Sequence, residues 1–116
     1  MSTPVGPYTP IVRAGDWLIV SGQIGLTPTG ELAPGLVAQT QQAIANLEAL
    51  LATEGASLAD VVKTTCFLVH MGDFAQFNEA YVEAFRGHRP ARTTIGVAAL
   101  PLGAVVEVEA WARVAP

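Results

Sequence analysis

Alternating apolar and polar residues predict β-strands at both ends of the chain and one in its middle. Residues 11–23 (IVRAGDWLIVSGQ) contain two apolar runs around Ala-Gly-Asp, a pattern typical of a hairpin that turns at Gly-Asp. The β-branched run VVKTTCFLVH predicts a strand over residues 61–70. Its alternation places apolar side chains on both faces, with Val61, Phe67 and Val69 on one and Val62, Cys66 and Leu68 on the other. Two further strands are predicted over residues 92–98 and 105–114, joined by a Leu-Pro-Leu-Gly turn.

Apolar residues at helical spacing predict two helices between these strands. The first covers residues 35–54, with positions 36, 40, 43, 44, 47, 50 and 51 on one face and Gly55 as the stop. The second begins near Asp73, a suitable N-cap residue. It places four aromatic residues on one stripe that we expect to be buried in the core: Phe74, Phe77, Tyr81 and Phe85.

The predicted order of elements is ββαβαββ. This order is typical of an α+β sandwich, in which two helices pack on one face of a mixed β-sheet. A length of 116 residues fits a single domain, residues 1–116, that can build one modest core.

The last strand, AVVEVEAWAR, has two faces of different character. Its even-numbered positions, from Val106 to Ala112, are all apolar and suit packing under the helices. Its odd-numbered positions carry Glu107 and Glu109 together with Trp111. Helices on one side cannot cover both faces, so we expect a second copy to cover the other face. The two glutamates lie about 7 Å apart along the strand, so burial and repulsion would raise the pKa of one of them.

The overall composition also favours a covered face. Apolar residues make up 51% of the chain and charged residues only 14%, which leaves few charges to coat a small domain. The net charge is −4, and the largest group of cations is Arg86, Arg89 and Arg92. We therefore do not expect the protein to bind a nucleic-acid backbone.

The sequence predicts a cytoplasmic protein with no disulfide, metal site or membrane segment. Cys66 is the single cysteine, and His70 and His88 are too isolated to suggest metal ligands. The N-terminus lacks the pattern of a signal peptide, and no apolar run approaches the roughly 18 residues of a membrane span.

Seven blocks of sequence extend over nearly the whole chain. They are GPYTP (6–10), SGQIG (21–25), QTQQAIAN (39–46), DVVKTTCFL (60–68), DFAQFNEAY (73–81), PARTTIGVAALP (90–101) and VEVEAWA (106–112). Together, in matching order and spacing, they resemble the RidA family, also called the YjgF/YER057c/UK114 family. Agreement of all seven makes the resemblance more specific than any single motif.

This resemblance implies a chorismate-mutase-like fold and a homotrimer with ligand clefts between its subunits. It also implies hydrolytic deamination of reactive enamines and imines, such as 2-aminoacrylate and 2-iminobutanoate, to 2-oxo acids and ammonia. The ligand would be a small carboxylate, and neither a metal nor an organic cofactor would be needed. A ribonuclease role is also attached to the family, but the acidic net charge argues against it here.

The family's site residues correspond to six positions in this sequence. Arg92 would bind the substrate carboxylate through two parallel hydrogen bonds, and Glu107 would take a proton from the attacking water. The remaining four would line the substrate pocket: Tyr8, Ser21, Asn78 and Thr94.

Some features depart from the family pattern. Thr94 stands where many members have cysteine, which leaves backbone contacts to the substrate but no thiol chemistry at that position. The connection FRGHRPAR before the predicted strand and the loop TPTGEL are shorter than in many members. Because the first of these segments would border the cleft, substrate size and preference stay open.

The residues alone also allow other interpretations. Arg92 could be a structural arginine, and Asn78 could serve an interface hydrogen bond. Glu107 could pair with Arg13 or Arg113 across neighbouring strands. A second hypothesis, from a different class of function, is a trimer that uses the same cleft to bind a small carboxylate metabolite without turning it over. The effect of replacing Glu107 on turnover would separate the two.

Overall fold

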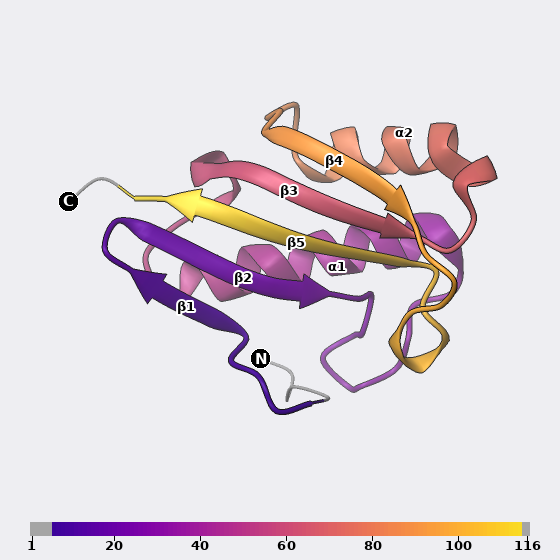
Figure 1. The fold of residues 1–116 in the computed structure, drawn as a ribbon, viewed down its shortest axis with the longest axis horizontal. Helices are drawn as coiled ribbons and strands as arrows, with labels where there is room; N and C mark the ends of the chain where they lie inside the picture. Colours follow the sequence, from indigo (N-terminus) through magenta and orange to yellow (C-terminus); the bar gives the residue numbers. More distant parts are fainter. Residues whose placement is uncertain (1–5, 115–116) are drawn as a thin grey trace.

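A hairpin opens the fold in this computed structural model, which describes residues 6–114 (Figure 1). Strands β1 (Ile11–Ala14) and β2 (Trp17–Gln23) pair antiparallel across a turn at Gly15 and Asp16. Gly15 has a φ of +62°, which a residue with a side chain adopts only with strain. The predicted hairpin is therefore confirmed. Residues 1–5 and 115–116 of the predicted domain lie outside the described residues.

Five strands form one mixed sheet in the order β1-β2-β5-β3-β4. Strand β5 (Val106–Arg113) is central and runs antiparallel to both of its neighbours, β2 and β3 (Val61–Leu68). Strand β4 (Ala91–Gly96) pairs in parallel with β3 at the edge of the sheet. A parallel pair needs a crossover between its strands, and α2 (Phe74–Ala84) provides it.

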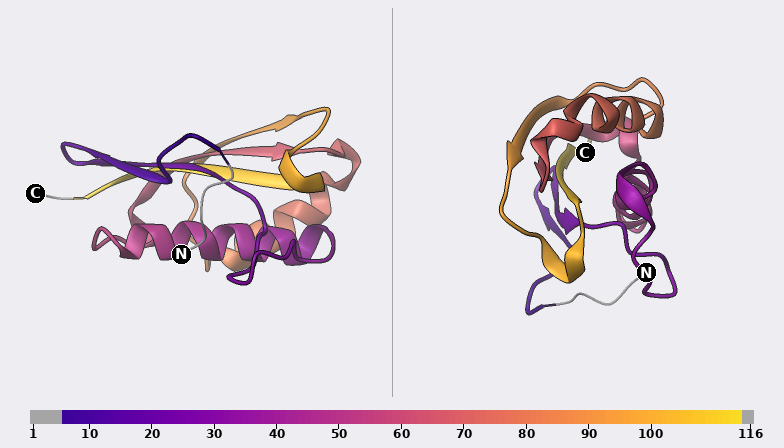
Figure 2. Two further views of the ribbon diagram at one scale, coloured as in Figure 1. Left: turned by 90° about the horizontal axis from the view of Figure 1, so that it is seen from below. Right: turned by 90° about the vertical axis from the view of Figure 1, so that its right-hand side faces the viewer.

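Both helices cover the same face of the sheet, as the views along it show (Figure 2). Helix α1 (Gly35–Ala52) lies under the central strands, and Gly55 follows it with a φ of +74°. The core between helices and sheet contains the largest fully buried side chains, among them Leu18, Leu47, Leu51, Leu68, Phe77, Val106 and Val108. The α+β architecture, the order of elements and the two helices on one face are all confirmed.

Strand β5 shows the expected separation of its two faces. The four side chains Val106, Val108, Ala110 and Ala112 are completely buried under the helices. On the other face, Glu107 and Glu109 are half-buried and Trp111 is 43% exposed. The Trp111 ring meets Trp17 of β2 edge-on, with 6.0 Å between ring centroids. The uncovered face therefore combines carboxylates with large apolar side chains.

A register shift changes the faces at the start of β3. Strict alternation would put Val61 on the same face as Phe67. The pairing of β3 with β5 is irregular between Val61 and Lys63, and Val61 is buried while Val62 is 43% exposed. The irregularity adds one residue to β3 between Val61 and Lys63. Side chains before it therefore alternate between the two faces in the opposite sense to those after it.

One expectation for the second helix was wrong. Phe77, Tyr81 and Phe85 are buried as predicted, but Phe74 is 38% exposed. Phe74 is the first residue of α2, where its ring lies over the Arg92 guanidinium and outside the buried core cluster. Asp73 is the N-cap residue of α2, as predicted. Its side chain makes no capping bond, because the chain enters α2 from the helical turn Met71–Asp73 and not from an extended segment.

No helix within residues 6–114 is both long and apolar enough to cross a bilayer.

The different environments of two phenylalanines on α2 predict different costs of truncation. Phe77→Ala should lower the free energy of unfolding by about 3–5 kcal/mol, because it leaves a cavity in the core. Phe74→Ala should cost much less, since that ring is partly in water. Urea unfolding of both variants at one protein concentration measures the difference, and equal losses would contradict the burial described here.

Candidate functional site

A pocket on the uncovered face of the sheet brings together residues from three distant parts of the chain. Its volume is about 390 Å³, within the range of small-molecule sites. The wall includes both carboxylates of β5. Three of the predicted site residues, Tyr8, Ser21 and Glu107, line this one pocket. The complete lining is Tyr8, Ser21, Gly22, Ile24, Pro101, Glu107 and Glu109.

A bulge in β2 places Ser21 and brings Tyr8 to the pocket. The pairing of β2 with β5 shifts between Val20 and Gln23, so Ser21 and Gly22 both stand opposite Glu109. The Ser21 hydroxyl donates a hydrogen bond to the carbonyl of Thr9 at 2.7 Å, and the Ser21 N–H donates to the next carbonyl along, that of Pro10, at 2.9 Å. These two bonds hold the segment that carries Tyr8 beside the strand.

Gly22 was not predicted as a site residue, yet it lies directly against Glu107. A Cβ atom at position 22 would be 2.8 Å from the carboxyl carbon and from one carboxyl oxygen of Glu107. Only glycine leaves room for the carboxylate in this position. A glycine inside an apolar strand was the available signal, because such a residue often marks a bulge or a close approach.

The environment of Glu107 makes it a better base than an ordinary glutamate. Burial raises the pKa of Glu107, and the negative charge of Glu109 raises it further. A carboxylate with a raised pKa holds a transferred proton more strongly at neutral pH.

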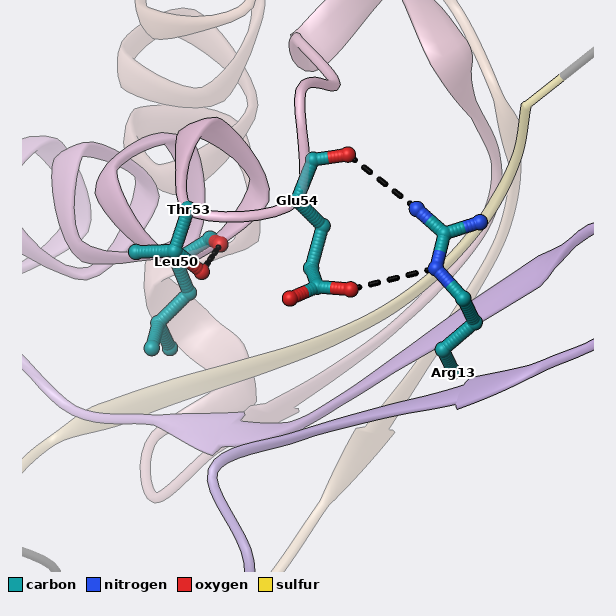
Figure 3. Close-up of polar contacts among 4 residues, drawn as sticks. All are labelled: Arg13, Leu50, Thr53 and Glu54. Atoms are coloured by element: carbon teal, nitrogen blue, oxygen red, sulfur yellow. Dashed lines mark hydrogen bonds and ion pairs between the residues drawn. The ribbon is translucent and has the colours of Figure 1, made fainter.

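The arginines that sequence reasoning offered as partners for Glu107 are engaged elsewhere. Arg13 donates to the side chain and to the carbonyl of Glu54, each at 3.1 Å, at the end of α1 (Figure 3). Arg113 lies 3.9 Å from Asp16. Within residues 6–114, no ion pair or hydrogen bond reaches the Glu107 side chain. The interpretation of Glu107 as a cross-strand ion-pair partner is therefore wrong.

Arg92 lies on the opposite side of the sheet from this pocket. It pairs in register with Thr64 of β3, which is fully buried on the helix side. Its guanidinium carbon is 4.9 Å from the ring centroid of Tyr81 and 5.5 Å from those of Phe74 and Phe77. Among the described residues no acceptor meets its N–H groups. The charge thus rests on aromatic faces while the hydrogen-bonding edge stays unused.

Asn78 and Thr94 lie on the Arg92 side of the sheet. Thr94 is two residues after Arg92 on β4 and pairs with buried Cys66, so both β4 side chains face α2. Asn78 is on α2 itself and, along the sequence, stands between Phe77 and Tyr81, whose rings contact Arg92. The Asn78 Oδ1 and Thr94 Oγ1 atoms are buried without a hydrogen-bond partner in the described part of the chain. Buried polar atoms of this kind call for a partner or a ligand.

The six predicted residues thus form two groups, separated by the sheet. Tyr8, Ser21 and Glu107 line the pocket on the uncovered face, whereas Arg92, Asn78 and Thr94 gather between β4 and α2. A small substrate cannot reach both groups within one subunit.

A sequence model of the Endoribonuclease L-PSP family, which includes the RidA proteins, matches residues 1–114. The chain belongs to this family. It is 44% identical to the 2-iminobutanoate/2-iminopropanoate deaminase of Mus musculus, covering 97% of this chain and 84% of that protein. RidA from the Antarctic bacterium Psychrobacter sp. superposes with a TM-score of 0.93 at 41% identity, covering 97% of this chain and 92% of that one. TdcF of E. coli with bound serine superposes with a TM-score of 0.92 at 34% identity, covering 97% of this chain and 91% of that one.

The resemblance to the RidA family seen in the sequence is therefore confirmed. Imine deamination is an activity named within this family.

Two amides of α1 fix the rim of the pocket in this RidA-family chain. Asn46 Nδ2 donates to the carbonyls of Ile24 and Leu26, at 3.2 and 2.9 Å. Gln39 is buried, and its Oε1 accepts from the N–H of Val105 at 2.9 Å. Both residues come from the QTQQAIAN block, for which the sequence indicated no role. The Asn46 bonds hold the segment that follows β2, and the Gln39 bond holds the residue that precedes β5.

Neither a metal nor a reactive thiol is evident among the described residues. No group of three or more His, Cys, Asp or Glu side chains in residues 6–114 is arranged to hold an ion. Burial raises the pKa of the Cys66 thiol to about 11, so it stays protonated at neutral pH and is a poor nucleophile.

The raised pKa of Glu107 can be measured directly. Its carboxyl titration, followed by carbon-13 NMR, should have a midpoint above that of an ordinary glutamate. Glu109→Gln should lower the midpoint only in part, because burial is the larger cause. A midpoint that returns fully to the ordinary value in Glu109→Gln would show that burial contributes little.

The same shift predicts how stability depends on pH. The folded chain binds this proton more tightly than the unfolded chain, so the free energy of unfolding should fall as pH rises through the raised pKa. Glu107→Gln should remove that part of the pH dependence in urea titrations. An unchanged pH profile would argue against the shift.

Proposed function

We propose that this chain is a hydrolytic deaminase of small 2-imino acids and their enamine tautomers, which acts without a cofactor in clefts between the subunits of a homotrimer. The observation that carries the proposal is the half-buried, unpaired carboxylate of Glu107 on the wall of a small-molecule pocket. Relatives that share 41–44% identity and are named 2-iminobutanoate/2-iminopropanoate deaminase support the substrate class. We expect the enzyme to work in the cytoplasm.

Each proposed role matches the chemistry of its side chain. The planar carboxylate of the substrate accepts two parallel hydrogen bonds from the Arg92 guanidinium, which fixes the C=N carbon. Glu107 takes a proton from a water molecule, whose oxygen attacks that carbon, and passes the proton to the imine nitrogen to give a carbinolamine. Glu107 then takes the hydroxyl proton of the carbinolamine and delivers it to the nitrogen as the C–N bond breaks. Ammonia leaves, the 2-oxo acid remains, and Glu107 regains its charge.

The separation of the two groups supports a cleft shared by neighbouring subunits. Arg92, Asn78 and Thr94 of one copy would face the pocket of Tyr8, Ser21 and Glu107 on the next copy. Such an arrangement would cover the apolar outer face of the sheet. It would also give the orphaned oxygens of Asn78 and Thr94 a place beside the ligand. Repeating the same contact around a threefold axis closes the assembly.

A second candidate function is binding without turnover. TdcF, a structural neighbour of this chain, was solved with bound serine, which is a small amino acid carrying a carboxylate. A protein that only senses such a ligand would need the Arg92 group but would not need Glu107 as a base.

Mixing two inactive variants tests the shared cleft. Arg92→Ala and Glu107→Gln should each lose nearly all acceleration of 2-iminobutanoate hydrolysis, followed by trapping the remaining imine with semicarbazide. When the two are co-expressed with different tags and purified as mixed trimers, about a third of native activity should return, since one of the three clefts in each mixed trimer contains both intact residues.

The control mixes two tagged copies of Arg92→Ala, which should stay inactive. Mixed trimers without recovered activity would contradict the shared cleft. A native trimer that binds 2-oxobutanoate but does not accelerate hydrolysis would establish the binding function instead, and a monomer in light scattering would exclude any site between subunits.

The contact of Gly22 with Glu107 gives a further test. Gly22→Ala should push the carboxylate out of position and lower kcat by about tenfold or more, because small displacements of a catalytic group are costly. Gly72→Ala is the matched control, since a Cβ there meets open space and its φ is not in the left-handed region. Equal kcat values for Gly22→Ala and the native enzyme would show that the carboxylate position does not limit turnover.

A further inference from the structure

Three aromatic rings of α2 surround the Arg92 guanidinium. Tyr81 is the nearest, with its ring centroid 4.9 Å from the guanidinium carbon, and Phe74 and Phe77 are each at 5.5 Å. A guanidinium so close to a ring face is attracted by the ring's negative π-surface, and more strongly where water is excluded. Tyr81 is 5% exposed, so its contact with Arg92 lies away from solvent.

Tyr81 is itself held from the other side by the neighbour of Arg92. Its hydroxyl is 2.7 Å from Thr64 Oγ1, a hydrogen bond buried between α2 and the sheet. Thr64 is fully buried and is the register partner of Arg92 on β3. Burial raises the pKa of Tyr81 to about 12, so the hydroxyl keeps its proton and can take part in this bond. Arg92 thus pairs with Thr64 across two strands, Thr64 is hydrogen-bonded to Tyr81, and the Tyr81 ring contacts Arg92. Each of the three residues is held by the other two.

These contacts fix the position of a side chain that is otherwise flexible. A free arginine loses considerable rotamer entropy when it grips a ligand. If the rings hold the guanidinium in place beforehand, that loss occurs on folding and not on binding, and affinity increases. The guanidinium carbon lies over the ring faces, and no acceptor among the described residues meets the N–H groups, so these stay available to a carboxylate.

We propose that Tyr81 and Thr64 are positioning residues, which pre-orient Arg92 for the carboxylate of the ligand. The inference rests on the proposed function in one respect, since it takes Arg92 as the group that binds the carboxylate. It adds that two residues that do not touch the ligand set the affinity for it. The alternative is that Tyr81 and Thr64 only fill the core and do not affect ligand binding.

Ligand affinity in matched variants separates these two roles. The probe is 2-oxobutanoate, the product of 2-iminobutanoate deamination, and its Kd is measured by calorimetry with the intact assembly. Tyr81→Phe keeps the ring but removes the hydroxyl, and Thr64→Val removes the other partner of the bond. Each should weaken binding by about fivefold, the effect of one buried hydrogen bond transmitted to the guanidinium.

Thr40→Val is the control for a general loss of stability. Thr40 is also fully buried, and its hydroxyl also makes one hydrogen bond, to the carbonyl of Leu36 within α1. This variant should lose stability as Thr64→Val does but should bind 2-oxobutanoate with native affinity.

A double-mutant cycle with Arg92→Ala decides the outcome. In that background Tyr81→Phe and Thr64→Val should change the Kd no further, because the group that they orient is gone. The inference is overturned if the two variants bind as tightly as the native protein, or if they weaken binding equally with and without Arg92. If Arg92→Ala itself leaves the Kd unchanged, the carboxylate-binding role in the proposed function fails as well, so the two failures are distinguishable.

Discussion

The alternation of side chains along β5 is the constraint on which the rest of this structure depends. The strand is hydrogen-bonded on both sides, to β2 and to β3, so it cannot slip without breaking two ladders. Its completely buried face fixes which residues point into the core, and a slip of one residue would put carboxylates there. The orientation of Glu107 therefore follows from the burial of Val106 and Val108 on either side of it.

The sheet also acts as a partition. Residues on opposite faces of a single sheet are separated by its backbone, so the Glu107 pocket and the Arg92 group are independent within one subunit. Each group is held by local means: a bulge and an N-terminal segment on one side, an aromatic stripe on the other. The chain can thus fold around a complete core while each half of its candidate site is incomplete. In this sense assembly, and not folding, would be the step that creates a working site.

Much of this arrangement could be predicted from sequence, because the patterns involved are periodic. Period-two alternation placed Glu107 opposite the core, and period-3.6 spacing located both helices. The errors arose where a local irregularity broke the period. A register shift reversed Val61 and Val62, and the start of α2 put Phe74 over Arg92.

The close approach of Gly22 to the carboxylate depends on contacts between strands, which a pattern along the chain does not contain. That Arg92 and Glu107 lie on opposite faces needed the register of β4 against β3, which the sequence did not specify.

The bulge in β2 shapes the pocket but is not required for the packing of the core. Two residues, Ser21 and Gly22, occupy a place where a regular strand would offer one. One of them ties down the N-terminal segment, and the other makes room for a carboxylate. Removing a single residue here would straighten the strand while Val20 kept its partner Ala110 and the core kept its packing. Lineages that lost this extra residue could therefore keep the same architecture and yet no longer share its chemistry.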